Sequence, residues 1–298
     1  MKTSSLFTGL VAVTFTAIFV FSSCEKNNDN ELSSADIELA EDAAYADLIF
    51  EDVMNEIDAA ESSGTLKSTT GECAIIDIQQ NDTICSISID YGEGCEQIIQ
   101  NRFGMPVDTI VRQGKIRIER HGRYRQQYSY RTVTLEDYSV NGIQLQGTRT
   151  VKNMGLDQNL HMWFTVELEN GKITTPDGIE ITRNSHRERH WVAGEDTEFN
   201  PWDDEYKVVG SAEGVTANGE NYQHRIMDSL HIKMACRFIV AGQIEFRFGD
   251  REPAVLDFGN GDCDGTATLS RDGYTREIAL KFTPRPMWRR VLRFGQHE

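Results

Sequence analysis

The sequence has only one long apolar run and no excess of positive charge. Of its 298 residues, 47 are Asp or Glu and 30 are Lys or Arg, so the formal net charge is −17. A chain this acidic repels the phosphate backbone, which argues against nucleic acid as a partner. The single apolar run, residues 6–21, is too little for a protein that crosses a membrane several times. With 39% hydrophobic and 26% charged residues the chain can still bury a core, so we do not expect wholesale disorder.

The chain also lacks the short motifs that mark common enzyme families. It contains no nucleophile elbow, no phosphate-binding glycine loop and no dinucleotide-binding fingerprint. Carboxylate pairs such as Asp203 with Asp204 occur, but in a chain this acidic such a pair says little about chemistry. We therefore expect no catalytic residues and a non-enzymatic binding or structural role. The enzymatic alternative is a metal- or carboxylate-dependent hydrolase, which would need carboxylates set across a cleft.

The N-terminus has the composition of a secretory signal. Lys2 supplies a positive charge, residues 6–21 are mostly apolar, and two serines lead into Cys24. Small residues followed by cysteine resemble a bacterial lipobox, in which the signal is cleaved before the cysteine and lipid such as palmitate is attached. The sequence therefore predicts a signal peptide over residues 1–23 and a lipidated Cys24 that anchors the protein to a membrane. The alternative is a plain secreted protein with a stray cysteine.

Most of the negative charge lies close to this predicted anchor. Residues 24–61 contain 13 acidic residues and one lysine, whereas the chain from residue 62 onward has 34 acidic and 28 basic residues. Residues 24–33 are polar and are predicted to form a tether, and residues 34–61 are predicted to form a helix. We expect one apolar stripe of this helix to dock on the body while its acidic face is solvated. An acidic helix that binds a partner is the alternative. The stripe consists of Tyr45, Ile49, Val53 and Ile57.

Residues 67–283 follow the two-residue period of β-strands. Between residues 160 and 168, for example, apolar and polar residues alternate, which is typical of a strand with one wet face. Asn-Gly and Asp-Gly pairs separate many such segments and favour tight turns between antiparallel strands. The sequence predicts a mainly β body of about twelve strands, a large antiparallel meander that forms a sandwich or a curled sheet.

Two cysteine-bounded segments of this body resemble each other and indicate an internal duplication into two related halves. Each begins with a cysteine, continues through two expected strands, and ends in an apolar-Asp-aromatic-Gly element, a glycine turn and a second cysteine. The repeat favours two disulfides, Cys73 with Cys95 and Cys236 with Cys263. Cys85 is left over, and its strand parity indicates a buried inert thiol rather than a reactive one.

Five blocks of the chain carry a resemblance to a known family. They read ISIDYGEGC, QGKIRIERHGRYR, DYSVNGIQLQGTRTVKN, RERHW and LDFGNGDCDGTATLSRDG. In these blocks the chain resembles a family of uncharacterised lipoproteins from Bacteroides-type bacteria, in which an acidic helix precedes a duplicated all-β body. The resemblance implies attachment to the outer membrane. Acidic residues soon after Cys24 are similar to the surface-export signals of such bacteria and favour an outward-facing position. The family brings no established activity or ligand with it.

Two groups of residues have spacings that suit metal ions. His186, Glu188 and His190 alternate along one strand, so two imidazoles and a carboxylate would share a face, as in a zinc site. Arg187 and Arg189 on the opposite face would be hard to bury, so a solvated polar strand is the simpler interpretation. The second group has the spacing of the first ligands in a calcium-binding loop. Arginine replaces the glutamate that such a loop needs at its twelfth position, so a hairpin turn is the simpler interpretation. We expect no cofactor, with calcium or zinc as alternatives. The calcium-like group is Asn260, Asp262 and Asp264.

Three tryptophans and the C-terminal tail are the remaining candidates for binding. Exposed aromatic rings can stack on sugars, so a glycan is a candidate ligand for Trp163, Trp191 and Trp202. The alternative is that these rings are covered by the helix or by a second layer of sheet.

The C-terminal tail, residues 284–298, combines arginines with apolar residues. Its basic face could pair with the acidic helix or an envelope protein partner, or meet anionic lipid.

Overall fold

The computed structural model describes residues 32–62, 74–81, 83–100, 106–123, 125–197, 200–236 and 238–280. The predicted signal peptide, Cys24, Cys73 and the basic tail lie outside the described residues. Within the described ranges, no helix has the length and apolar character needed to cross a membrane.

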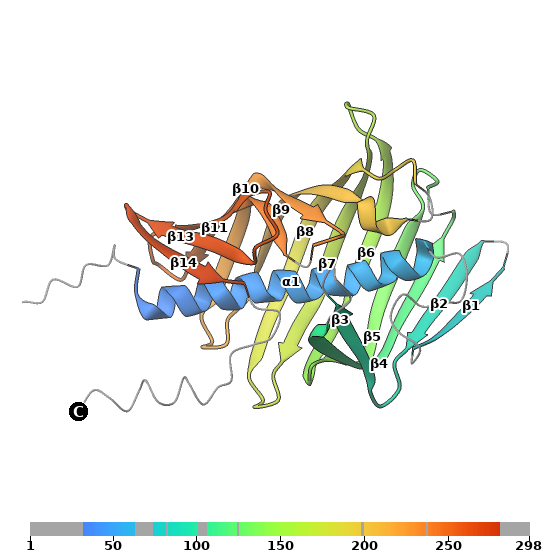
Figure 1. Ribbon diagram of the computed structural model, residues 1–298, viewed down its shortest axis with the longest axis horizontal. Helices are drawn as coiled ribbons and strands as arrows, with labels where there is room; N and C mark the ends of the chain where they lie inside the picture. The colour runs from blue at the N-terminus through green and yellow to red at the C-terminus, as the bar shows by residue number, and fades with distance from the viewer. Residues whose placement is uncertain are drawn as a thin grey trace, which may run out of the picture.

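The described body is one open antiparallel sheet of fourteen strands (Figure 1). The spatial order is β1-β2-β4 and then follows the chain to β14, while β3 pairs with the first half of β4. The mainly β, antiparallel class is therefore confirmed, as a single curled sheet. The strands are β1 (Ile75–Gln80), β2 (Ile84–Asp90), β3 (Cys95–Gln100), β4 (Pro106–His121), β5 (Tyr130–Val140), β6 (Ile143–Leu156), β7 (Met162–Thr174), β8 (Glu180–Ala193), β9 (Glu205–Val215), β10 (Asn221–Lys233), β11 (Ile239–Phe248), β12 (Ala254–Asn260), β13 (Thr266–Arg271) and β14 (Tyr274–Ala279).

Tight turns hold consecutive strands side by side. Between β5 and β6 the turn is Asn141-Gly142, whose φ angles are 51° and 77°. Two successive left-handed residues form the hairpin turn whose twist matches that of the flanking strands, and Asn-Gly adopts it readily. Turn chemistry of this kind produces a meander rather than a crossover topology.

One long helix, α1 (Ser34–Ser62), lies across the strands along the long axis of the molecule (Figure 1). Its 29 residues make it about 44 Å long. Ser33 caps the first turn: its Oγ accepts the N–H of Asp36 at 3.2 Å, and the Asp36 carboxylate accepts the N–H of Ser33 at 2.9 Å. This reciprocal pair satisfies two backbone donors that a helix N-terminus otherwise leaves free.

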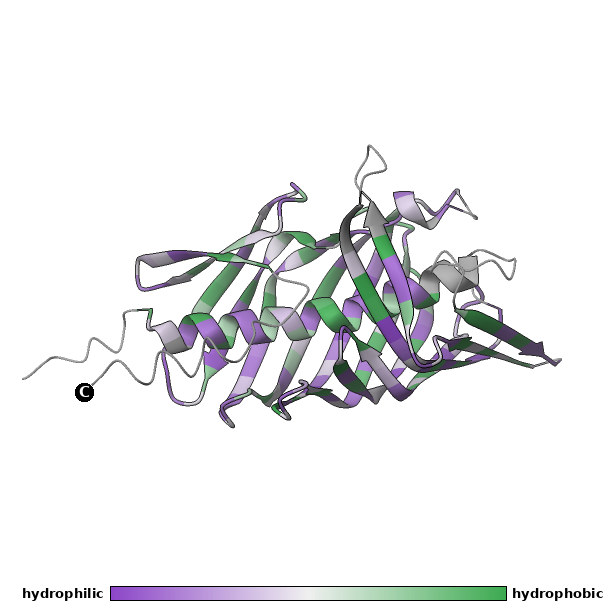
Figure 2. Ribbon diagram, turned by 60° about the horizontal axis from the view of Figure 1, so that its bottom comes forward, coloured by the Kyte–Doolittle hydropathy of each residue, from purple (hydrophilic) through white to green (hydrophobic). Residues whose placement is uncertain are grey.

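The core lies between α1 and the inner face of the sheet. Hydrophilic and hydrophobic residues alternate along the strands (Figure 2), so each strand offers one apolar face to the helix. The predicted helical stripe is buried, as expected. The expectation of a solvated acidic face is wrong, however, because every residue of α1 from 43 to 51 is buried, Asp47 and Glu51 included.

The two repeated elements share one side-chain hydrogen bond and a buried aromatic residue. Asp90 accepts the N–H of Gly92 at 2.9 Å, and Asp257 accepts that of Gly259 at 2.8 Å. The aromatic residues between them, Tyr91 and Phe258, are both buried in the core. In both elements an aspartate side chain therefore accepts the N–H of the glycine two residues on, and the aromatic residue between them is buried in the core.

The cysteines agree with the predicted framework as far as they are described. Cys236 and Cys263 form a disulfide with a Cα–Cα distance of 5.9 Å. Cys95 is buried and disulfide-bonded, while its predicted partner Cys73 lies outside the described residues. Cys85 is a buried free thiol, as its strand parity indicated.

Candidate functional site

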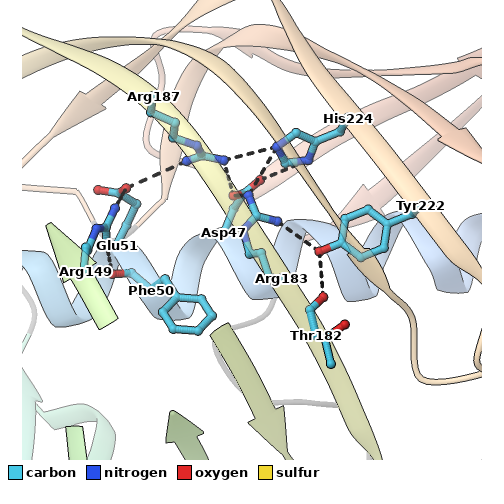
Figure 3. Close-up of polar contacts among 9 residues, drawn as sticks. All are labelled: Asp47, Phe50, Glu51, Arg149, Thr182, Arg183, Arg187, Tyr222 and His224. Atoms are coloured by element: carbon cyan, nitrogen blue, oxygen red, sulfur yellow. Dashed lines mark hydrogen bonds and ion pairs between the residues drawn. The ribbon is translucent and has the colours of Figure 1, made fainter. Parts of the chain in front are cut away.

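The helix-covered face of the sheet carries arginines that bind the carboxylates of α1. Arg183 and Arg187 of β8 both donate to Oδ1 of Asp47 (Figure 3). Arg149 of β6 donates to Glu51 at 3.0 Å and to the main-chain oxygen of Phe50 at 2.7 Å. Each of these charged side chains is less than 10% exposed. Buried charges are tolerated when they are paired and hydrogen-bonded in this way.

Burial and pairing set the ionisation of this cluster. Burial alone would raise the pKa of Asp47, but the Arg183 and Arg187 guanidiniums outweigh it and hold this pKa at about 2. His224 lies 3.2 Å from Arg183 and 3.3 Å from Arg187 through Nε2. Since arginine only donates, Nε2 must accept, and the ring is neutral with its proton on Nδ1. Burial lowers the pKa of His224 well below its ordinary value.

A second cluster binds the C-terminal half of the helix. Arg112 of β4 is 1% exposed and donates to Asp52 and, at 3.2 Å, to Glu56. Tyr91 donates to the other Glu56 oxygen at 3.0 Å. Burial raises the pKa of Glu56, and the neighbouring Asp52 charge adds to this, because one guanidinium faces two carboxylates.

A third cluster binds the helix N-terminus. Asp36 accepts from Arg251 at 2.9 Å and lies 3.0 Å from Arg271 of β13. Burial opposes ionisation here, but hydrogen bonds from Ser33 and the two arginines hold the pKa of Asp36 at about 2. The three clusters hold α1 along its length, so these carboxylates stabilise the fold rather than meet a ligand.

The burial of Arg187 and Arg189 corrects the expectation that they would be hard to bury. They are 3% and 5% exposed. Arg189 lies over the Tyr206 ring at 3.6 Å and within 3.9 Å of Glu51, so its charge is balanced from α1 and its guanidinium plane is packed. The sequence held a signal for this arrangement, because both arginines share strand parity with apolar Ile181 and Trp191.

The opposite face of the sheet is polar and hollowed. An open groove of about 960 Å³ runs over β7 to β11. One register row crosses it, in which each residue faces the next on the neighbouring strand. The row combines carboxylates, an imidazole, a hydroxyl and a guanidinium, all able to form hydrogen bonds with a ligand. It consists of Glu167, His186, Ser211, Arg225 and Glu245.

The proposed zinc residues share a face but do not converge. His186 lies 3.2 Å from Glu167, whereas His190 lies 2.7 Å from Asp157. Glu188 is 3.8 Å from His190. Throughout the described ranges, no three His, Cys, Asp or Glu residues form a group that could hold a metal ion. Residues two apart on a strand are separated by roughly 6.6 Å, and each histidine here is held by a different carboxylate.

The calcium-like residues form a turn rather than a site. Asp264 accepts the N–H of Thr266 at 3.0 Å, so its carboxylate stabilises the local backbone. Asn260 ends β12 and Asp262 is exposed, and neither joins a group that could hold a metal within the described chain. The hairpin interpretation fits this geometry.

The three tryptophans do not form one platform. Trp191 is 4% exposed and donates to Asp204 at 3.2 Å, so its ring is covered and is not available to stack on a ligand. Trp163 is half-buried and stacks on His190 with ring centroids 5.6 Å apart. Trp202 lies in a short 3-10 helix, η1 (Pro201–Asp203), and is 57% exposed. Trp163 and Trp202 therefore keep accessible ring surface, but from different elements.

Comparison with known proteins gives no relative from which a function could be transferred. No family model, no curated protein and no solved structure matches this chain.

Proposed function

We propose that this protein is a lipid-anchored protein of the cell envelope that binds a polar ligand or an envelope partner on its open sheet face, without catalysis. The observation that carries the proposal is the contrast between the two faces. Buried ion pairs commit one face to α1, while the other presents a polar groove of about 960 Å³. Ligands usually bind in hollows of the surface, where polar groups fix their orientation.

The position of the helix limits how far the folded body can lie from the proposed anchor. Leu32 already packs against the core, so only residues 24–31 separate the predicted lipid from the folded body. Eight residues span at most about 28 Å, so the body would stay close to the membrane surface. We propose the outer membrane as its location, with the protein exposed at the cell surface.

Metabolic labelling with a palmitate analogue tests the anchor. We expect the wild-type chain to be labelled and membrane-bound, and Cys24→Ser to be unlabelled and released from membranes. Cys85→Ser is the matched control, because it removes the buried free thiol and should keep both label and membrane attachment. Equal labelling of Cys24→Ser and the wild type would contradict the anchor.

The proposed ligand is a glycan, a choice supported by the exposed Trp202 ring and the hydrogen-bonding row in the groove. A glycan array probed with the full chain carrying Cys24→Ser tests it. If the groove is the binding site, we expect Arg225→Ala to lower the affinity for any glycan that the array identifies. Trp202→Ala should weaken binding about two- to tenfold if that ring stacks on a sugar. Tyr274→Ala, at the far end of the sheet, serves as the exposed aromatic control.

A further inference from the structure

β1 forms one edge of the sheet and leaves a row of backbone groups without a strand partner among the described strands. Within the described part of the chain it pairs only with β2, and the N–H of Asn81 donates to the main-chain oxygen of Ile84 at 3.0 Å at the hairpin end. Since hydrogen-bonding direction alternates along an antiparallel strand, Asp77 and Gln79 point their backbone groups toward β2. The backbone groups of Ile76, Ile78 and Gln80 therefore point outward.

This edge carries few of the features that usually prevent strand addition. It carries no proline, lysine or arginine and has a single charged residue, Asp77, while Ile75 and Ile78 are 71% and 43% exposed. The opposite edge, β14, differs because exposed Arg276 and Glu277 lie along it. Charged residues on an edge strand discourage pairing with another chain, whereas apolar ones favour it.

We propose that two copies of this protein pair antiparallel through their β1 strands, about a two-fold axis that passes between the two Ile78 residues. The sequence of β1 fits its own copy in this register. Asp77 then faces Gln79 of the second copy, an amide against a carboxylate, and Ile76 faces Gln80. No like charges stand directly opposite each other, and the outward backbone groups of Ile76, Ile78 and Gln80 find partners.

The same register extends the core. Ile76 and Ile78 lie on the helix side of the sheet, opposite buried Ile89 and Ile87 of β2, and Ile76 already packs partly against the core. Pairing would cover the exposed part of both Ile78 side chains. Since six-residue strands bury a small area, the dimer is weak and depends on concentration.

Disulfide trapping tests the register directly, using the full chain with Cys24→Ser. In Ile78→Cys the two new thiols face each other across the axis, with Cα atoms about 5.5 Å apart, within disulfide range. In Ile75→Cys the residue is more exposed, but its counterpart lies roughly 20 Å away along the strand. We expect copper-phenanthroline oxidation to cross-link Ile78→Cys into a dimer and to leave Ile75→Cys monomeric. Equal cross-linking of both variants, or of neither, would overturn the proposal.

A second variant distinguishes loss of pairing at the β1 edge from loss of folding. Ile78→Pro removes an outward N–H and no hydrogen bond to β2, so the hairpin should persist. We expect this variant to sediment as a monomer at concentrations where the Cys24→Ser chain shows dimer, with an unchanged circular dichroism spectrum. A folded Ile78→Pro chain that still dimerises to the same extent would contradict pairing through β1.

Discussion

Asp47 shows how a single acidic residue can be buried in this fold. Its carboxylate is 1% exposed and accepts from two guanidiniums of β8. Removing one partner of a buried ion pair leaves the other charge desolvated and without compensation. Loss of the Asp47 charge would leave two buried arginines, beside a neutral histidine, without that carboxylate partner.

Substitution of Asp47 should therefore be far more damaging than loss of a surface ion pair. We expect Asp47→Asn to lower the free energy of unfolding by about 3 to 5 kcal/mol. The control is Glu180→Gln, which removes an exposed pair with Lys172 at 2.7 Å and should cost about 0 to 1 kcal/mol. Urea denaturation of the Cys24→Ser chain measures both. Similar losses in the two variants would show that the Asp47 pair is not a buried one.

At the scale of elements, α1 is an integral part of the hydrophobic core rather than an appendage. Its apolar residues from Leu39 to Ile57 belong to the same cluster as the inner residues of the sheet. Buried ion pairs at both ends and in the middle add directional contacts. A helix held in this way is not available as an acidic partner-binding segment without loss of the core.

Hydrogen exchange should report this coupling. We expect amides in the buried middle of α1, residues 43–51, to exchange only through global unfolding, with the same opening free energy as central strands such as β7. The edge strand β14 is the internal comparison and should exchange faster because most of its residues are exposed. If α1 exchanged faster than β7 under the same conditions, the helix would undock as a separate unit.

At the scale of the whole molecule, the net charge of −17 conceals a local balance. The most acidic segment of the chain lies against a sheet face that carries buried Arg112, Arg149, Arg183 and Arg187. These charges neutralise each other across the core, while the open face mixes both signs. The stability of the protein should therefore depend on pH through groups whose pKa values move in opposite directions.

The pH profile should have two distinct arms. Asp36 and Asp47 have pKa values held at about 2 against 3.8, so their stabilisation is present above the ordinary pKa and is lost as pH falls toward 2. Glu56 has a raised pKa, so its contribution is complete below its ordinary value of 4.5 and is lost as pH rises through the raised one. We expect Glu56→Gln, which mimics the protonated acid, to gain in Tm relative to the wild type as pH rises. A difference in Tm that stays constant with pH would contradict this assignment.

The sequence predicted much of the fold but little of the polar architecture. Strand periodicity and the Asn-Gly turns indicated the antiparallel meander, and the predicted start of the helix at residue 34 is the observed one. The burial of the inner arginines was not predicted, because a charged residue is expected to face solvent when its buried partner is unknown. Asp47 and Arg183 are 136 residues apart, and no local pattern links them.

The sequence by itself determined the class of the fold, the cysteine repeat and the separation of the acidic helix from a near-neutral body, because each depends on local spacing or composition. Only the tertiary structure decided which face of the sheet the helix covers, which charges are buried together, and that Trp191 is enclosed while the other face is hollowed. These features depend on contacts between residues far apart in the chain, whose energies are set by burial and geometry rather than by sequence neighbours.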